Sequence, residues 1–272
     1  MERNSLGAGS WGEVTSGIIR RTRQRVAVKM VRVSDSHRRE QLLNDLQGLA
    51  LAEGCQHLVQ CYGGFVSRKG FGFVNVVLEL MDLGSMVDLL KRLTGTGVEP
   101  RMLSYVTQQI TQGLAYLHGR KLVHRHLQPE YILHNRAGEV KLGHLAIDFS
   151  TDDNRDCLVR TATYMSPERW MGEEDSGFIE TWSVGVVIYE LATGRCPFNG
   201  SIMPVLYEEV CVRPEPRLDE GLFPSELCTF VACCLTRDVD KRADSFSLQE
   251  HPFLNSGVPM RQDLSAWLKT IC

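Results

Sequence analysis

The sequence predicts an α+β fold, with a β-rich part over residues 1–80 and a mostly helical part from residue 85 onward. Two features favour this division. Residues 26–33 and 74–80 are short segments rich in β-branched side chains, a composition that is typical of strands. After residue 85, apolar residues recur three and four positions apart, which is the spacing of one helix face.

The elements follow in order along the chain. Residues 36–53 carry leucines at helical spacing and are expected to form a helix between the two strands: Leu42, Leu43, Leu46 and Leu49. Further helices are expected over residues 86–93, 102–117, 181–191 and 222–235. We expect a single domain over residues 1–272, with an N-lobe of about 1–80, a hinge of about 79–84, a C-lobe of about 85–259 and a tail of about 260–272.

Composition narrows the class of protein. A chain of 272 residues with 43% hydrophobic content can bury a substantial core. Its net charge of −3 indicates neither a nucleic-acid partner nor a membrane surface, and no apolar run reaches the length of a membrane span. The nine cysteines are scattered without a C-x-x-C pair, which argues for reduced thiols and against structural zinc. We therefore expect a cytoplasmic protein.

A glycine-rich segment near the start matches the pattern G-x-G-x-x-G-x-V at Gly7, Gly9, Gly12 and Val14. Glycines let a backbone bend over phosphates and donate N–H groups to them, although such a string alone is better explained by an ordinary hairpin turn. The strand residues Ala27-Val28-Lys29 follow closely, and this spacing favours a nucleotide site. Because the segment begins at residue 7, we expect almost no strand before it, as in a truncated N-terminus.

Three further strings appear in order. Residues 124–131 read His-Arg-His-Leu-Gln-Pro-Glu-Tyr, residues 141–146 read Lys-Leu-Gly-His-Leu-Ala, and residues 163–169 read Thr-Tyr-Met-Ser-Pro-Glu-Arg. Together with the glycine segment, they resemble the motifs of protein kinases. Residues 81–85 are similar to the same segment of the dual-specificity MAP kinase kinases. The resemblance covers residues 5–256 and implies a bilobal protein-kinase fold, with a β-rich N-lobe and a helical C-lobe.

The resemblance implies roles for particular residues. Lys29 would hold the α and β phosphates of ATP and pair with an acidic residue on the next helix, either Asp45 or its rival Glu40. The nucleotide-binding set would be Gly7, Gly9, Gly12, Val14, Ala27, Lys29, Glu79, Met81 and Leu133. Plain hydrophobic packing is compatible with the apolar members of this set.

The same resemblance assigns scaffold positions. His124 would be a core residue beside Leu145 and Leu49, and Arg125 would belong to the catalytic loop. Glu168 would pair with Arg242, since an uncompensated buried charge would cost about 3–5 kcal/mol. Glu180 stands where the family usually has aspartate.

Four positions depart from the family pattern. His126 replaces the aspartate that accepts the substrate proton, and loss of such a base alone costs about 10²–10⁴ in rate. Gln128 replaces a lysine that contacts the γ-phosphate. Tyr131 and His144 replace the asparagine and aspartate that bind magnesium, which prefers hard oxygen ligands. None of the catalytic residues is therefore intact; ATP binding is compatible with the remaining residues, and Mg²⁺ binding is in doubt.

Other interpretations stay open. Asp148-Phe149-Ser150 resembles a displaced metal-binding motif, although placing His144 in that position keeps the spacing to Thr161 close to the family's. Histidines can also bind zinc, and a cluster is conceivable among His124, His126, His134 and His144. In the following loop, the two positions at which the family is phosphorylated correspond to Asp153 and Cys157, and Arg160 replaces a glycine.

Three functions compete. The first is a pseudokinase of MAP kinase kinase type that acts as a scaffold or allosteric regulator of other protein kinases, either a MAP kinase or an upstream kinase. The second is an active kinase that phosphorylates a MAP kinase. The third is a switch that senses ATP without metal. The first is favoured because four substitutions fall in one site.

Overall fold

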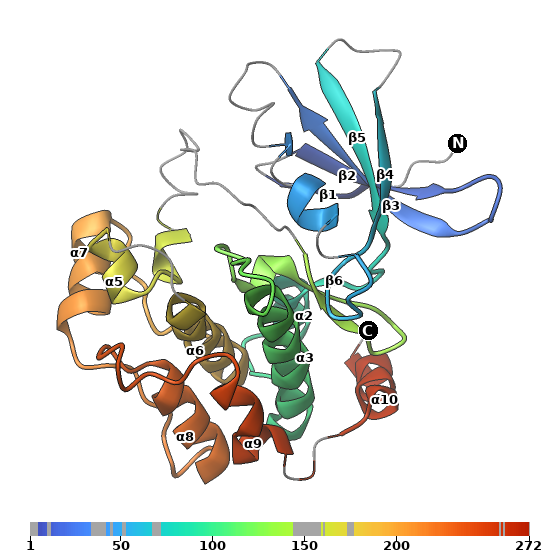
Figure 1. The fold of residues 1–272 in the computed structure, drawn as a ribbon. Coiled ribbons are helices and arrows are strands. Elements are labelled where there is room, and N and C mark those ends of the chain that lie inside the picture. The colour runs from blue at the N-terminus through green and yellow to red at the C-terminus, as the bar shows by residue number, and fades with distance from the viewer. Residues whose placement is uncertain are drawn as a thin grey trace.

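The structure is a computed structural model. It describes residues 5–9, 12–33, 42–43, 46–50, 53–66, 72–143, 159, 161–172, 177–255, 257 and 259–271. A β-sheet is formed by the first part of the chain, and the remainder is mainly helical (Figure 1). The expected α+β architecture with two lobes is confirmed.

The N-terminal lobe is built on one antiparallel sheet with the strand order β1-β2-β3-β5-β4. Its strands are β1 (Ser5–Gly9), β2 (Gly12–Ile18), β3 (Arg25–Arg32), β4 (Cys61–Val66) and β5 (Phe73–Glu79). The strands expected over residues 26–33 and 74–80 correspond to β3 and β5. The glycine segment itself forms most of β1 and the start of β2, and only Ser5 and Leu6 of β1 precede Gly7.

The central strand β3 fixes the positions that face the second lobe. It pairs with β2 on one side, where Val14 lies opposite Lys29, and with β5 on the other, where Ala27 lies opposite Leu78. Val26, Ala27 and Val76 are buried. Residues 42–43 and 46–50 are helical, as expected, with Leu42 buried and Leu43 exposed.

A second, small sheet begins the C-terminal lobe, with β6 (Gly84–Ser85), β7 (Ile132–His134) and β8 (Val140–Leu142) in the order β6-β7-β8. The longer helices are α2 (Met86–Arg92), α3 (Pro100–His118), α6 (Gly177–Thr193), α8 (Ser225–Cys234) and α10 (Arg261–Ile271). The shorter ones are η1 (Pro129–Tyr131), α5 (Pro167–Trp170), α7 (Met203–Tyr207), η2 (Glu208–Val212), η3 (Ser247–Glu250) and α9 (Pro252–Asn255).

Helix α2 starts where its sequence provides a cap. The Ser85 hydroxyl accepts a hydrogen bond from the Asp88 N–H, and the Asp88 carboxylate accepts one from the Ser85 N–H. This reciprocal arrangement satisfies N–H groups that would otherwise lack partners at a helix start. The link of residues 80–83 between β5 and β6 is therefore followed directly by a capped helix start at Ser85.

Helices α3 and α6 pack together at the centre of the C-terminal lobe (Figure 1). Trp182 of α6 is fully buried and its ring stacks on Phe198 with 6.2 Å between centroids. Val184, Val186 and Ile188 on the same helix are also fully buried. The all-round apolar character of α6 is typical of a helix that runs through a core.

One expected helix boundary was wrong, and the expected tail turns out to be helical. The helix expected over residues 222–235 begins only at Ser225, because Pro224 fixes an extended backbone there. The expected tail over residues 260–272 contains helix α10, whose Leu264 and Leu268 are buried. Arg261 at its start donates a hydrogen bond to the Ala137 carbonyl and so ties α10 to the β7–β8 turn.

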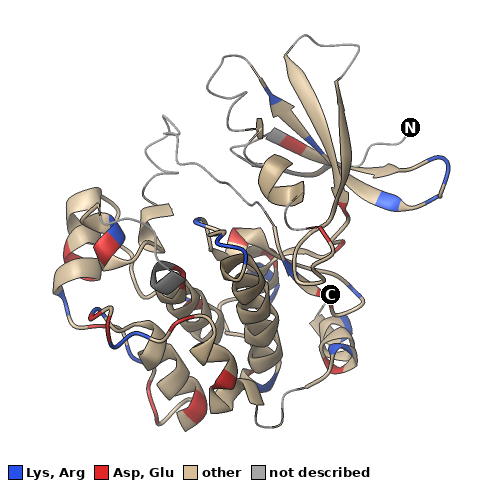
Figure 2. Ribbon diagram, viewed as in Figure 1, with Lys and Arg blue, Asp and Glu red and all other residues tan. Residues whose placement is uncertain are grey.

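Charged residues of both signs are spread over both lobes (Figure 2). Arg20, Arg21, Arg23 and Arg25 are exposed together around the β2–β3 turn, a local cluster that the near-neutral total charge did not reveal. Within the described part of the chain, we find no helix with the length and apolarity needed to cross a membrane.

Candidate functional site

The catalytic-loop segment of residues 124–131 has a constrained backbone. Arg125 adopts a left-handed conformation with φ of 67°, which a non-glycine residue adopts only at a cost of about 1–3 kcal/mol. Two contacts hold it. The Arg125 N–H donates to Glu180 Oε1 at 2.6 Å, and the Arg125 carbonyl accepts from Arg169 Nη1 at 2.8 Å. The shape of the loop is thus set by α6 and α5.

Glu180 is a buried carboxylate shared between three elements. Besides Arg125, it contacts His118 at the end of α3, with 2.5 Å between Oε2 and Nε2. The other His118 ring nitrogen lies 2.6 Å from Ser245 Oγ. Burial by itself would raise the pKa of Glu180, but the hydrogen bonds and charges from His118 and His124 and the Arg125 N–H lower it. Glu180 therefore stays ionised and keeps accepting both bonds.

His124 lies in the core, as expected. It is fully buried, and its Nε2–H donates to the Gly143 carbonyl at 2.9 Å. Its Nδ1 has no hydrogen-bond partner among the described residues. Burial lowers the pKa of His124, so the ring is neutral near pH 7. The bond to Gly143 connects the catalytic loop to the end of β8.

His126 has lost most of its basicity. Its pKa is lowered to about 3, first by burial and then by the neighbouring charges of His124, Arg169 and Arg125. The ring meets Tyr131 edge to face, with 6.4 Å between centroids and 78° between planes. At pH 7 this side chain is a neutral imidazole in an environment of positive charge.

The remaining departures on the loop are held in place by backbone bonds. Gln128 is buried, and its carbonyl accepts the Tyr131 N–H at 3.0 Å. The Tyr131 carbonyl in turn accepts the Gly143 N–H at 2.8 Å. The position of the family's metal-binding asparagine therefore carries a phenol on an ordered backbone.

The residues expected to bind the nucleotide lie on β1, β2, β3, β5 and β7 and on the link to β6. Ala27 and Met81 are buried, and Val14, Lys29 and Leu133 are half-buried. A Cβ placed on Gly143 would lie 3.3 Å from Leu133 Cδ1. Val14, Ala27 and Lys29 thus belong to the N-terminal sheet, and Leu133 lies on β7 of the C-terminal lobe.

Glu79 at the end of β5 has a partner that sequence reasoning missed. Its two carboxylate oxygens lie 2.7 and 2.8 Å from Lys141 Nζ on β8. Lys141 is 8% exposed, so the pair is largely removed from water. A charge pair therefore joins the N-terminal sheet to the C-terminal lobe beside residues 80–83.

The expected scaffold pair of Glu168 and Arg242 is present in the structure. Arg242 Nη1 contacts Glu168 Oε1, and Nη2 lies 2.9 Å from Oε2. Both residues are buried, and the Arg242 Nε donates to the Thr236 carbonyl at 2.6 Å. The bidentate geometry compensates both buried charges.

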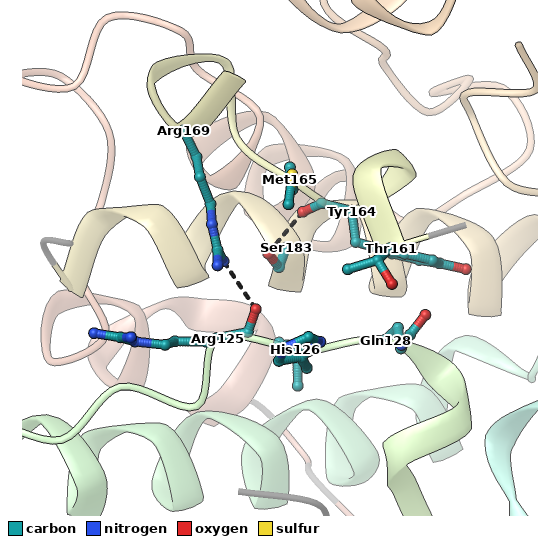
Figure 3. A pocket seen from close by; sticks show the side chains of 9 residues that line it. Arg125, His126, Gln128, Thr161, Tyr164, Met165, Arg169 and Ser183 are labelled. Carbon is teal, nitrogen blue, oxygen red and sulfur yellow. Dashed lines mark hydrogen bonds between the residues drawn. The ribbon is translucent and has the colours of Figure 1, made fainter. Parts of the chain in front are cut away.

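A small cavity lies between the catalytic loop and the segment before α5 (Figure 3). Residues 125–128 line one side, and Thr161, Tyr164, Met165 and Arg169 line the other, with Ser183 of α6. The Tyr164 hydroxyl donates to Glu190 Oε2 at 2.6 Å, and the Ser183 hydroxyl donates to the Tyr164 carbonyl. These bonds fix the segment to α6.

Several expected site residues fall outside the described residues: Glu40, Asp45, His144, Leu145, Asp148, Asp153, Cys157 and Arg160. Among the described residues, no group of three or more histidine, cysteine or acidic side chains could hold a metal ion. His134 is fully buried on β7, and neither of its ring nitrogens has a hydrogen-bond partner in the described part of the chain. Burial lowers its pKa to about 4.

The contacts of Glu180 and of Lys141 have only weak signals in the sequence. In the sequence, Glu180 stands out only because it replaces the family's usual aspartate. His118 and Ser245 belong to no motif and lie far from Glu180 along the chain. Lys141 stands next to a motif and could have been considered as a partner for an acidic residue near the hinge.

Comparisons with known proteins agree with the motifs. Residues 1–254 match the family model described as "Protein kinase domain". The chain is 33% identical over 272 residues to Mitogen-activated protein kinase kinase 3 of Arabidopsis thaliana, covering 98% of this chain and 52% of that protein. It is 32% identical to Mitogen-activated protein kinase kinase 1 (96% and 76%) and 34% identical to Mitogen-activated protein kinase kinase 2 (92% and 70%) of the same plant. The chain thus spans about half of the first relative and about three quarters or less of the other two.

Proposed function

Because the chain belongs to the protein kinase family and MAP kinase kinases are its relatives, we propose that it is a pseudokinase that regulates a partner kinase. In this proposal the folded domain acts as a scaffold or allosteric regulator in a MAP kinase cascade. The domain binds its partner and biases the partner's conformation without transferring phosphate.

The observation that carries this proposal is the state of His126. The family's base is an aspartate, whose negative charge attracts the proton of the substrate hydroxyl. His126, whose pKa is lowered to about 3, is a neutral ring at pH 7 and lacks both that charge and the carboxylate geometry. The causes are burial and adjacent arginines, which belong to the scaffold of the loop. The loop is therefore well ordered and chemically unsuited to accept a substrate proton.

The family generally uses ATP with Mg²⁺, and the donor set of this chain fits magnesium poorly. By the family resemblance, Tyr131 offers a phenol in place of an amide oxygen, and residue 144 is a histidine in place of a carboxylate. Magnesium prefers octahedral oxygen ligands. We propose that this site does not hold the metal in the family's manner, and no catalytic step is assigned to it.

Nucleotide binding fits the residues better than metal binding does. Lys29 lies on the central strand opposite Val14, with Ala27 and Met81 buried nearby in the fold. By the family resemblance, Val14, Ala27 and Leu133 would form an apolar slot for the adenine ring. We propose that ATP acts on this domain by shifting its conformation and not as a phosphate donor. The presence of Lys29 and the apolar residues makes a switch that senses ATP without metal the second candidate function.

We propose that the partners are protein kinases, either a MAP kinase or an upstream kinase, and that the protein works in the cytoplasm. The segment from Thr161 to Arg169 supports a docking role because it is fixed to α6 through Tyr164 and Ser183. A rigid surface loses less conformational entropy on binding than a loose one.

The first test measures phosphate transfer from radiolabelled ATP to a MAP kinase by purified protein, with a Lys29→Met variant alongside. Loss of the base and of metal binding together is expected to reduce the rate by at least about 10³ relative to an active relative. Signal that survives Lys29→Met comes from a contaminant. Turnover near that of an active kinase, abolished by Lys29→Met, would refute the pseudokinase proposal.

The second test separates the three functions by thermal unfolding with ATP, with and without Mg²⁺. A ligand that binds the folded state raises the melting temperature. Stabilisation that requires the metal supports an active kinase, and stabilisation in either condition supports the ATP-sensing switch. The absence of any shift supports a regulator that works without nucleotide.

A further inference from the structure

The hairpin that joins β2 to β3 carries a dense positive charge. Four exposed arginines fall within six residues: Arg20, Arg21, Arg23 and Arg25. The whole stretch of residues 14–33 contains no acidic residue. The hairpin projects from the N-terminal sheet, and its tip stands out as basic (Figure 1, Figure 2). We call residues 18–25 the arginine hairpin.

These four charges are not neutralised within the described part of the chain. None of the four arginine side chains forms an ion pair or a hydrogen bond with another described residue. Glu79, which lies opposite Val26 at the base of the hairpin, has its carboxylate oxygens 2.7 and 2.8 Å from Lys141 Nζ. The acidic group at the base is therefore already paired, and the arginine hairpin keeps its positive charge.

The backbone of the turn shows that arginine is not the residue that the turn itself requires. The Arg23 N–H donates to the Ile19 carbonyl at 2.8 Å, and the Ile19 N–H donates to the Gln24 carbonyl at 2.9 Å. Arg23 has φ of 62°, in the left-handed region that glycine adopts at no steric cost and other residues adopt with strain. A guanidinium is thus kept at a position where stability alone favours glycine or asparagine, which points to a role in binding.

An apolar side chain stands beside the charges. Ile18 is 54% exposed and lies directly opposite Arg25 in the β2–β3 pair. Two residues that are directly opposite in an antiparallel pair present their side chains on the same face, within reach of a common ligand. The surface of the arginine hairpin therefore combines several guanidinium groups with one apolar contact.

The charge of the rest of the molecule favours a short partner segment over an extended anionic surface. Apart from the four hairpin arginines, 26 lysines and arginines stand against 33 acidic residues. A bilayer or a long nucleic acid would bring its negative charge close to these acidic residues as well, and the charges would repel each other. A short acidic segment can contact the projecting hairpin alone. Guanidinium groups also match carboxylates in a bidentate geometry.

We propose that the arginine hairpin binds an acidic segment of a partner polypeptide. Carboxylates of the segment pair with the arginines, and an apolar side chain next to them contacts Ile18. This surface belongs to the N-terminal sheet and uses no residue of the catalytic loop. It goes beyond the proposed function, because an active kinase and a regulator without phosphate transfer could both use it.

Fluorescence anisotropy with the whole chain, in the absence of nucleotide, tests the proposal. The probe is a labelled peptide in which four glutamates surround one leucine, and its control is the same peptide with glutamine in place of each glutamate. We expect the acidic peptide to bind at least about tenfold more tightly than the control at about 0.05 M salt. At about 0.5 M salt most of this advantage should disappear, because salt screens exposed charges.

Two double variants with the same change of charge locate the binding. Arg21→Gln combined with Arg23→Gln is expected to weaken binding of the acidic peptide by at least about tenfold. The matched control is Arg101→Gln combined with Arg195→Gln, which removes two exposed arginines outside the hairpin. Its affinity is expected to stay within about threefold of the parent, since the total charge of the protein changes equally in both variants.

A further variant separates binding from folding. Arg23→Gly removes one guanidinium and places glycine in the left-handed position of the turn. The melting temperature is therefore not expected to fall, whereas affinity for the acidic peptide is expected to fall by at least about threefold. A lower melting temperature with unchanged affinity would show that Arg23 serves the fold and would contradict the proposed binding role.

Other results would also overturn the proposal. Equal affinity for the acidic and glutamine peptides removes the acidic specificity, and equal losses in the two double variants place the binding outside the hairpin. Vesicles of phosphatidylcholine with phosphatidylserine and a DNA duplex serve as additional probes. If either binds more tightly than the peptide and depends on Arg21 and Arg23, the hairpin is a membrane or nucleic-acid surface instead. Phosphate transfer to a MAP kinase would refute the pseudokinase proposal and leave these measurements unchanged.

Discussion

Glu180 links three parts of the C-terminal lobe through one carboxylate. It accepts the Arg125 N–H and contacts His118, and it is 1% exposed. Removing one acceptor from such a buried arrangement leaves a donor without a partner, which costs about 1–3 kcal/mol.

We predict that Glu180→Gln destabilises the protein by about 1–3 kcal/mol, because the amide retains only one oxygen for two donors. Urea unfolding followed by far-UV circular dichroism measures the change. The control is Glu208→Gln on the surface, whose ion pair with Arg213 is half exposed and is expected to contribute less than about 1 kcal/mol. Equal effects of the two substitutions would contradict the role assigned to Glu180.

The residue scale also shows what sequence can predict. The pair of Glu168 and Arg242 was predicted because both residues stand in recognisable motifs. The contact of Glu180 with His118 was not, because it depends on the packing of α3 against α6. The very low basicity of His126 was also missed, since it arises from burial and from the approach of Arg169. Residue identity alone does not report burial.

At the scale of elements, helix α10 depends on a close approach at the β7–β8 turn. Gly138 has φ of 80°, and a Cβ added there would lie 2.2 Å from the Arg261 carbonyl oxygen and 3.0 Å from the Ser265 nitrogen. The Ser265 hydroxyl also donates to the Arg136 carbonyl at 2.7 Å. The turn and the start of α10 therefore fit each other only when residue 138 lacks a side chain.

We predict that Gly138→Ala detaches or displaces α10. The expected signs are faster amide hydrogen exchange in residues 261–271 and a loss of stability larger than the cost of backbone strain alone. The matched control is Gly172→Ala: its φ is 81°, but no heavy atom lies within 4 Å of the added Cβ. That control is expected to lose about 1–2 kcal/mol and to leave exchange in α10 unchanged. Similar exchange in both variants would disprove the close-fit explanation.

Element existence was easier to predict than element boundaries. Strands β3 and β5 were predicted because their β-branched runs are unbroken, whereas β4 contains Gly63 and Gly64 and was missed. Helix α10 was not predicted within the expected tail, although the apolar residues there follow a helical spacing: Leu264, Trp267, Leu268 and Ile271. That pattern was visible in the sequence, but the partner surface on the β7–β8 turn was not.

At the scale of the whole molecule, three buried histidines make folding sensitive to acid. The pKa values of His124, His126 and His134 all lie below the ordinary 6.5, the last two at about 3 and about 4. Between pH 6.5 and about 4 the unfolded chain therefore binds more protons than the folded one. Stability is complete above pH 6.5 and falls as the pH drops through this window.

We predict that the free energy of unfolding decreases from pH 7.5 to pH 5, with each histidine contributing up to about 1.4 kcal/mol per pH unit. His134→Leu should reduce this slope, because it removes a titrating ring that has no hydrogen-bond partner among the described residues. Urea titrations at a series of pH values measure both slopes. A variant whose stability falls as steeply as that of the parent would show that His134 is not protonated on unfolding.

The contacts that hold the Arg125 backbone have a consequence for engineering. The bonds to the Arg125 N–H and carbonyl come from Glu180 of α6 and Arg169 of α5. Two residues outside the catalytic loop thus hold its backbone at Arg125. We expect that the side chains of His126, Gln128 and Tyr131 can be exchanged, singly or together, while Glu180 and Arg169 keep holding the backbone. The loop is therefore a suitable starting point for the directed evolution of new side-chain chemistry on a fixed backbone.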